Sequence, residues 1–325
     1  MDWLTKLELT ELHTHVGASV SSTMLLEMAH NQGIKLPTKD YWQFEKMITL
    51  QHKENLNDYL KKFELTELIQ SSPEAMFTAL ETAVSGAFRK NNITTLELRY
   101  NPIFRNRRGE RDLDHTIVFS LQGMERAMLK YPVRAGVILC MDRRLPVAAN
   151  KIIVEKAIKY KNRGVVGIDL AGSYDGPIKA KMIKSLVGQA RAAGLGITIH
   201  TGETADVNEM WEVINELKPD RVGHGIACVA DPKLMRLLVK NKTVLEICPT
   251  SNINTKVVKD YREFKQIFTI LNRFGVNYTI NTDGSEMQQV NLREEFRRLI
   301  SHKVLNQAEL IKANEVAKHA SFINI

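Results

Sequence analysis

The chain has 325 residues, of which 44% are hydrophobic and 25% charged, an ordinary composition for a globular protein. No apolar run reaches the roughly 18–20 residues that a membrane-spanning helix needs, so we expect no membrane association. The net charge of +8 permits a nucleic-acid partner, but basic residues alternate with acidic ones, as in residues 293–298, and we expect solvated helix faces and no nucleic-acid binding.

Short apolar runs bounded by Gly, Pro and Asn recur along the chain and predict eight strands. In chain order the strands cover residues 9–15, 95–101, 134–141, 165–171, 196–200, 221–225, 244–248 and 277–281. Apolar spacings of three and four predict helices over residues 152–161, 178–193, 232–240 and 261–274. Several strands are continuously apolar, which is typical of parallel strands covered on both faces. Strands that alternate with helices in this way predict an α/β fold, a (β/α)8 TIM barrel.

The interval between the first two strands, residues 16–94, is too long for a single crossover helix. It contains helical patterns over residues 57–69 and 73–90. We expect it to form a helical insertion near the barrel mouth. No linker-like stretch or break in composition divides the chain, so we predict one domain over residues 1–325.

Histidines and a carboxylate stand at the C-terminal ends of predicted strands, the face on which barrel enzymes carry their active sites. His13 and His15 end the first strand, His200 the fifth and His224 the sixth, and Asp283 follows the eighth. Alternate residues of a strand point to the same side, so His13 and His15 can face one ion. Imidazole nitrogens and carboxylate oxygens are typical ligands of zinc. The pattern therefore predicts a metal site at the barrel mouth.

One metal ion is favoured over two. A two-metal barrel hydrolase that bridges its ions with a carboxylated lysine needs a lysine in the fourth strand, and residues 165–171 contain none. Glu203 follows His200 by three residues, close to such an ion but free to move protons. A single metal that activates water is the main tool of a hydrolase.

The three cysteines lie far apart, in or beside apolar runs: Cys140, Cys228 and Cys248. Their odd number and setting favour reduced, packed thiols over a disulfide framework. A cleavable signal is not expected either, because cleavage would remove His13 and His15. We therefore predict a cytoplasmic protein.

Eight motifs, taken together and in order, resemble the adenosine deaminase family from end to end of the chain. They are Glu11-Leu12-His13-Thr14-His15, Asp58-Tyr59-Leu60-Lys61-Lys62-Phe63, Glu97-Leu98-Arg99-Tyr100-Asn101-Pro102, Asp169-Leu170-Ala171-Gly172, His200-Thr201-Gly202-Glu203, Arg221-Val222-Gly223-His224-Gly225, Cys248-Pro249-Thr250-Ser251-Asn252 and Asn281-Thr282-Asp283. The resemblance implies a hydrolase that acts on C–N bonds of cyclic amidines in purine metabolism, with a small aminopurine or related heterocycle as its partner.

The resemblance also implies a role for each site residue. One zinc ion per chain would be held by His13, His15, His200 and Asp283. It would lower the pKa of a bound water to about 7, so that hydroxide attacks C6 of a purine-like ring. The other implied roles are proton transfer from the nucleophile to His224 and Asp283, protonation of N1 by Glu203, and a contact between the backbone N–H of Gly172 and the other ring edge.

Two positions depart from the family pattern. The first motif of the family usually continues into Leu-Asp-Gly, whose Asp binds the ribose 5′-hydroxyl, but this chain has Gly17 there. The family also usually carries a second Asp directly after the metal-binding one, on the N7 side of the purine, and here the residue is Gly284. Ser285 and Glu286 are the candidate substitutes for that second contact.

Three functions are therefore open. The leading one is a zinc-dependent hydrolytic deaminase of adenosine or a related 6-aminopurine nucleoside. The second keeps the chemistry but changes the substrate to a 5′-modified nucleoside, adenosine monophosphate, adenine or a pterin. The third is a degenerate, non-catalytic binding protein, against which the complete ligand set and Glu203 argue.

Four arginines after the second predicted strand are candidates to bind a phosphate or carboxylate, although a solvated basic loop is the simpler interpretation: Arg105, Arg107, Arg108 and Arg111.

Overall fold

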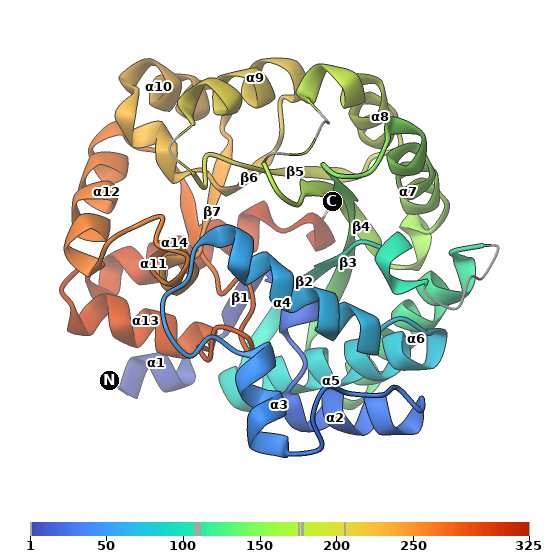
Figure 1. The fold of residues 1–325 in the computed structure, drawn as a ribbon. Helices are drawn as coiled ribbons and strands as arrows, with labels where there is room; N and C mark the ends of the chain where they lie inside the picture. The colour runs from blue at the N-terminus through green and yellow to red at the C-terminus, as the bar shows by residue number, and fades with distance from the viewer. Residues whose placement is uncertain (1, 107–111, 175, 177–178, 205, 325) are drawn as a thin grey trace.

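Eight parallel strands stand side by side in the order β1 to β8, with helices around them (Figure 1). This computed structural model describes residues 2–106, 112–174, 176, 179–204 and 206–324. The strands are β1 (Leu9–His15), β2 (Ile93–Tyr100), β3 (Arg134–Asp142), β4 (Val165–Ala171), β5 (Gly196–Thr201), β6 (Arg221–His224), β7 (Val244–Ile247) and β8 (Tyr278–Ile280). Each strand pairs in parallel with the next. The prediction of a (β/α)8 barrel is confirmed.

The α-helices of the described residues include four between β1 and β2. The fourteen are α1 (Asp2–Lys6), α2 (Ser22–Asn31), α3 (Tyr41–Ile48), α4 (Leu56–Ile69), α5 (Pro73–Asn91), α6 (Asp114–Lys130), α7 (Val147–Lys159), α8 (Ala180–Ala192), α9 (Val207–Leu217), α10 (Pro232–Asn241), α11 (Pro249–Asn254), α12 (Tyr261–Phe274), α13 (Leu292–Ser301) and α14 (Gln307–Ala320). No helix in the described part of the chain has the length and apolar character to span a bilayer.

The helix α12 shows how the local sequence determines an element. The Asp260 side chain accepts hydrogen bonds from the first free backbone N–H groups, and Gly275 ends the helix in a left-handed conformation. Between these two residues, apolar side chains at helical spacing, including Phe264 and Phe268, are buried against the barrel. The observed bounds therefore coincide with the predicted ones.

Residues 293–298 of α13 are only partly the solvated face that the alternating charges predicted. Arg293 and Glu295 are buried. Arg293 donates a hydrogen bond to the carbonyl of Asn91, and the Glu295 carboxylate accepts one from the backbone N–H of Thr250. Charge alternation therefore did not distinguish the exposed side of this helix from the side that packs on its neighbours.

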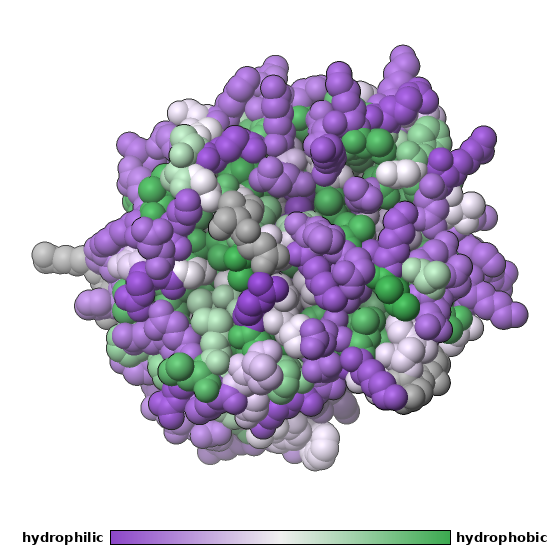
Figure 2. Space-filling view, turned by 180° about the vertical axis from the view of Figure 1, so that it is seen from behind, coloured by the Kyte–Doolittle hydropathy of each residue, from purple (hydrophilic) through white to green (hydrophobic). Residues whose placement is uncertain are grey.

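The surface opposite to the view of Figure 1 is mainly hydrophilic. Figure 2 shows hydrophilic side chains over most of this face, with hydrophobic residues in small groups between them. The exposed large hydrophobic residues of the whole described surface are spread over several helices, among them Trp42 on α3, Leu129 on α6 and Met182 on α8. Most helices thus present polar faces to solvent.

The barrel closes between β1 and β8 at three of the predicted metal ligands. Thr14 and Asp283 form a parallel bridge outside the regular ladders. The backbone N–H of His15 donates to the carbonyl of Asp283 at 2.8 Å, and the N–H of Asp283 donates to the carbonyl of His13 at 2.9 Å. The backbone hydrogen bonds that join the first strand to the last therefore belong to residues whose side chains form the site.

Candidate active site

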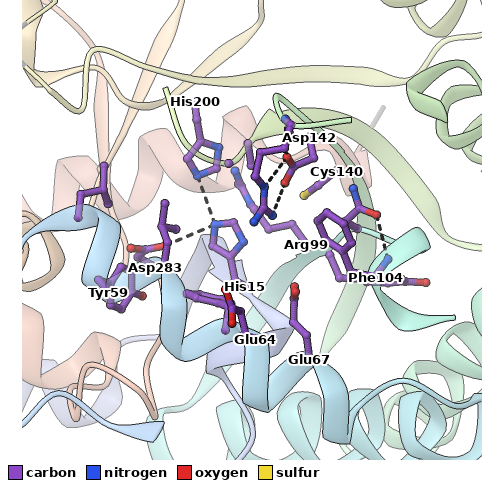
Figure 3. Close-up of a pocket in the computed structure, with 18 of the residues that line it drawn as sticks. His15, Tyr59, Glu64, Glu67, Arg99, Phe104, Cys140, Asp142, His200 and Asp283 are labelled. Atoms are coloured by element: carbon purple, nitrogen blue, oxygen red, sulfur yellow. Dashed lines mark hydrogen bonds and ion pairs between the residues drawn. The ribbon is translucent and has the colours of Figure 1, made fainter. Parts of the chain in front are cut away.

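A cavity lies at the C-terminal ends of the strands, under the helix α4. The predicted site residues that line it are His15, Gly172, His200, Glu203, His224 and Asp283. Figure 3 shows His15, His200 and Asp283 converging on one side of this cavity, with Tyr59, Glu64 and Glu67 of α4 nearby. The structure thus brings together residues from β1, β4, β5, β6 and the end of β8.

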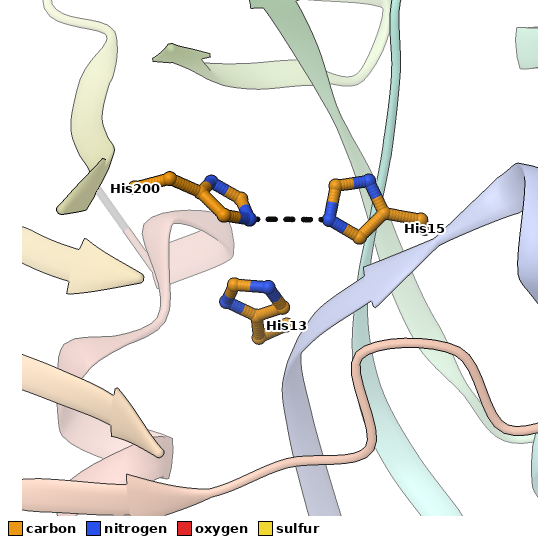
Figure 4. Close-up of side chains that lie close together, drawn as sticks. All are labelled: His13, His15 and His200. Atoms are coloured by element: carbon orange, nitrogen blue, oxygen red, sulfur yellow. Dashed lines mark hydrogen bonds between the residues drawn. The ribbon is translucent and has the colours of Figure 1, made fainter. Parts of the chain in front are cut away.

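The predicted metal ligands converge on one point. The ligand atoms of His13, His15 and His200 all lie within 4.8 Å of one another (Figure 4). Oδ1 of Asp283 lies 3.6 Å from Nε2 of His13 and 3.4 Å from Nε2 of His15. Nε2 of His13 is buried and has no hydrogen-bond partner among the described residues. A buried nitrogen of this kind needs a partner, and the imidazoles of His15 and His200 and the carboxylate of Asp283 lie around it. The four side chains together fit a divalent metal ion.

Carboxylates contact the Nδ1 atoms of two of these histidines. Nδ1 of His13 lies 2.7 Å from Oε2 of Glu246, and Nδ1 of His200 lies 2.9 Å from Oδ2 of Asp169. Arg99 joins the two carboxylates, with its Nη1 2.9 Å from Asp169 and its Nη2 2.8 Å from Glu246. Such partners fix the ring orientation of metal-binding histidines, so that the other ring nitrogen points at the ion.

Both carboxylates stay ionised although they are fully buried. Burial alone would raise the pKa of Asp169, but the charges of His200 and Arg99 outweigh it and hold the pKa below its usual range. Burial likewise opposes the shift at Glu246, and the charges of Arg99 and Arg221 lower its pKa well below the usual value. The positioning network therefore supplies negative charge next to the predicted cation.

Asp169→Asn is expected to weaken metal binding by about 10- to 100-fold, because the neutral amide no longer orients His200 as the carboxylate does. The measurement is metal dissociation in competition with a chelator. Glu295→Gln is the matched control, since Glu295 is also fully buried but contacts none of the four ligands in the described interactions. Equal affinities in the two variants would contradict the positioning role.

Glu203 follows β5 and is placed by a glycine turn. Gly202 has a positive φ of 63°, and a Cβ at this position would lie 2.6 Å from the sulfur of Met210. Oε1 of Glu203 lies 3.7 Å from Nε2 of His224. Burial, together with the charge of Asp283, raises the pKa of Glu203 to about 7. A carboxylic acid with such a pKa can both hold and release a proton near neutrality.

His224 and Asp283 both adopt left-handed backbone conformations, with φ of 63° and 65°. Such conformations are uncommon for residues other than glycine and persist where the surrounding structure enforces them. The α11 segment supports both side chains: the amide of Asn252 lies 3.1 Å from Nδ1 of His224, and the hydroxyl of Ser251 donates to Oδ2 of Asp283 at 2.6 Å. Their side chains are thus held in place.

The side chains of His224 and Asp283 differ in charge. Burial lowers the pKa of the His224 imidazole to about 4, so the ring is neutral at neutral pH. Burial would raise the pKa of Asp283, but the nearby imidazole of His13 and the charges of His15 and His224 hold it well below its usual range. A charged carboxylate therefore stands beside a neutral imidazole, an arrangement that can orient a nucleophile and accept its proton.

Gly172 lies at the end of β4, on the cavity wall. Its φ is +92°, and a Cβ here would lie 2.7 Å from a carboxylate oxygen of Asp142. No other residue fits this backbone and this space without a shift of Asp142. The position is therefore suited to a backbone contact with a ligand.

Ser285 and Glu286 do not reach this cavity, so the expectation that they replace the missing Asp is corrected. After Gly284 the backbone turns toward the segment that follows β1. There the N–H of Glu286 donates to the carbonyl of Ala18 at 3.0 Å. Both residues line a second cavity of about 350 Å³ beside α5, and the Glu286 carboxylate pairs with Lys90 at 2.7 Å. Closeness to Asp283 in the sequence therefore did not predict where these side chains lie.

Of the four arginines after β2, Arg105 lies on the cavity wall and is buried. Its Nη2 lies 3.5 Å from Oε1 of Glu67, and a Cβ on Gly17 would be 3.0 Å from the same nitrogen. The ring of Phe63 occupies the other side of that position, 2.9 Å from the same Cβ. Arg107, Arg108 and Arg111 fall outside the described residues.

The positioning roles of Arg99, Asp169 and Glu246 were not predicted from the sequence, although a signal was present. Asp169 and Glu246 are the single charged residues of β4 and β7, and Arg99 alternates with Glu97 in β2. A charge inside a barrel strand must be paired in the interior, which marks it as part of a network. No such feature of the sequence marked Tyr59, whose side chain also lines the cavity.

The family profile described as "Adenosine deaminase" matches residues 9–325. A curated adenosine deaminase from Clostridium kluyveri is 31% identical over 314 residues, covering 96% of this chain and 89% of the relative.

Two solved structures share the fold. The Arabidopsis N6-mAMP deaminase MAPDA superposes with a TM-score of 0.84 at 23% identity, covering 99% of this chain and 95% of that one. A Burkholderia ambifaria amidohydrolase with bound Zn gives a TM-score of 0.85 at 19% identity, covering 99% and 87%.

Proposed function

Because the chain belongs to the adenosine deaminase family and is a hydrolase of C–N bonds in cyclic amidines, we propose that it is a zinc-dependent deaminase of adenosine or a related 6-aminopurine compound. The observation that carries the proposal is the buried, unpartnered Nε2 of His13, which faces His15, His200 and Asp283 while Glu203 stands nearby as a proton carrier. The zinc bound in the Burkholderia structure supports the choice of metal.

His13, His15, His200 and Asp283 would hold the ion. A bound zinc ion lowers the pKa of water to about 7, which makes hydroxide available at neutral pH. Asp283 and His224 would orient the nucleophile toward C6 of the purine and accept its proton.

Glu203 donates a proton to N1, so that the ring accepts the nucleophile. The backbone N–H of Gly172 contacts the other ring edge. The proton accepted from the nucleophile would pass to the amino group, which leaves the tetrahedral C6 centre as ammonia. Each of these groups lines the same cavity in the structure.

The structure supports a second candidate substrate, which differs from adenosine at the 5′ group. Where a carboxylate would bind a ribose hydroxyl, the chain has Gly17, with the guanidinium of Arg105 and the ring of Phe63 against it. A guanidinium binds phosphate or carboxylate oxygens well. The Arabidopsis protein of similar fold is named an N6-mAMP deaminase. We propose that adenosine is not the best substrate and that an anionic or otherwise modified 5′ group is preferred.

The test is ammonia release from adenosine, 5′-modified adenosines, adenosine monophosphate, adenine and a pterin. For the monophosphate, Arg105→Met is expected to lower kcat/KM by about 10- to 100-fold, the effect of losing a charge-assisted hydrogen bond, with a much smaller effect for adenosine. Arg105→Lys is the matched control that keeps the charge. A kcat/KM for adenosine of about 10⁴–10⁸ M⁻¹s⁻¹, above that of every other compound, would contradict the substrate proposal.

We further propose that residues 16–94 act as an insertion in a single domain, since α4 from this interval supplies part of the cavity wall. A cytoplasmic location is proposed on the three cysteines, which are free and buried, as suits a reducing compartment.

A further inference from the structure

Tyr59 places a buried hydroxyl at the wall of the cavity. The side chain is 2% exposed, and no group among the described residues is in hydrogen-bonding geometry with its oxygen. The ring of Phe63 packs against it edge-on, with the ring centres 5.5 Å apart. The polar side chain beside it is Gln288, whose amide bonds to Ser251 and Asn254. Because a buried hydroxyl without a partner costs roughly 1–3 kcal/mol, its position on the cavity wall indicates that a ligand supplies the partner.

Gly284 makes room for this hydroxyl. A Cβ at position 284 would lie 3.1 Å from the Tyr59 oxygen and 2.4 Å from the Cβ of Ala18. A side chain at this position therefore cannot coexist with the packing of Ala18, and one directed into the cavity would crowd the Tyr59 hydroxyl. The hydroxyl thus lies where the family places its second carboxylate, the contact that Ser285 and Glu286 do not make.

The hydroxyl is suited to donate. Burial and the charge of Asp283 raise the pKa of Tyr59 well above its usual value, an effect that nearby Gln288 opposes. The phenol therefore keeps its proton at neutral pH. A purine offers acceptors on the two sides of C6, N1 in the six-membered ring and N7 in the five-membered ring.

The order of the strands indicates which acceptor the hydroxyl meets. Gly172 and Glu203 follow the adjacent strands β4 and β5, whereas Tyr59 lies beside Gly284, which follows β8. In the eight-stranded order, β8 and β4 stand on opposite sides of the barrel. A flat ring that gives its N1 edge to Glu203 therefore directs its N7 edge toward Tyr59.

We propose that the Tyr59 hydroxyl donates a hydrogen bond to N7 of the substrate and so selects purines over rings that lack an acceptor there. This inference rests on the proposed function, because it uses the orientation in which Glu203 serves N1. It assigns to a helix of the β1–β2 interval a contact that the residues after Asp283 do not supply.

The experiment compares substrates that differ only at N7. Adenosine, adenosine monophosphate and adenine are each paired with the 7-deaza analogue, in which a C–H replaces N7. For the best substrate, the wild-type protein is expected to lose about 10- to 100-fold in kcat/KM on the change to the analogue, since the buried hydroxyl loses its acceptor. Tyr59→Phe is expected to lose a similar factor on the parent compound and little further on the analogue.

Tyr41→Phe is the matched control, because the Tyr41 hydroxyl bonds to Ser22 on α2 and Tyr41 is not among the residues that line the cavity. Melting temperatures of both variants report whether the fold is intact. An equal loss for Tyr59→Phe on parent and analogue, or no loss on either, would overturn the inference. Equal wild-type rates on parent and analogue would overturn it without any variant, whereas a protein that deaminates none of the parent compounds would defeat the proposed function itself.

Discussion

Asp283→Ala and His13→Ala are each expected to lose the metal ion and the deaminase activity together. The wild-type protein should bind about one zinc ion per chain, since four ligands complete a mononuclear site. Asp283 faces both His13 and His15 with one oxygen, so its removal takes away a ligand and the negative charge that balances the cation. Elemental analysis of the purified variants, beside ammonia release, is the measurement.

The backbone at Asp283 requires a control. Its φ of 65° is costly for alanine but tolerated by asparagine, so Asp283→Asn separates the loss of the ligand charge from backbone strain. His13→Ala carries no such cost, because His13 lies in the extended strand β1. Two ions per chain in the wild-type protein, or unchanged occupancy in both alanine variants, would show that the metal site is assigned wrongly.

Glu203→Gln is expected to retain the metal ion and the fold but to turn over about 10²–10⁴-fold more slowly. The amide has nearly the same shape as the acid, and Glu203 is not among the converging ligand atoms. What the variant loses is a proton that a group with a pKa of about 7 can deliver to the ring. The measurement is kcat beside metal content and melting temperature.

Glu209→Gln is a suitable comparison for Glu203→Gln. Glu209 lies on the neighbouring helix α9 and pairs with Arg143 at 2.7 Å, and it is not among the residues that line the cavity. Its substitution should leave kcat close to that of the wild-type protein. A Glu203→Gln variant as active as this comparison would mean that another acid protonates the substrate.

The repeating pattern of the sequence was sufficient for the barrel. The bounds of β1, β4 and α12 were predicted to the residue. Gly164 and Gly172 flank β4, and Asp260 and Gly275 flank α12, so a punctuating residue limits each of these two segments at both ends. The convergence of His13, His200 and Asp283 was also predictable, since in a parallel barrel every strand ends on the same face. Local signals combined with one topological rule were enough for these features.

Contacts that depend on the path of a loop were not predictable in this way. Ser285 and Glu286 are adjacent to the site in the chain, but a turn behind β1 carries them to another cavity. Tyr59 is more than two hundred residues from Gly284 in the chain, and only packing of α4 over the barrel brings the two together. Strand periodicity contains no information on such a pairing, because the position of a covering helix depends on the side chains beneath it.

Where β1 meets β8, the main chain and the side chain of the same two residues have different roles. The peptide groups of His15 and Asp283 hold the first strand to the last, while their imidazole and carboxylate face the cavity. Mutation can exchange the side chains but leaves those peptide groups in place. Descendants of this chain can therefore acquire a different ion or a different reaction at this point without needing a new way to close the barrel.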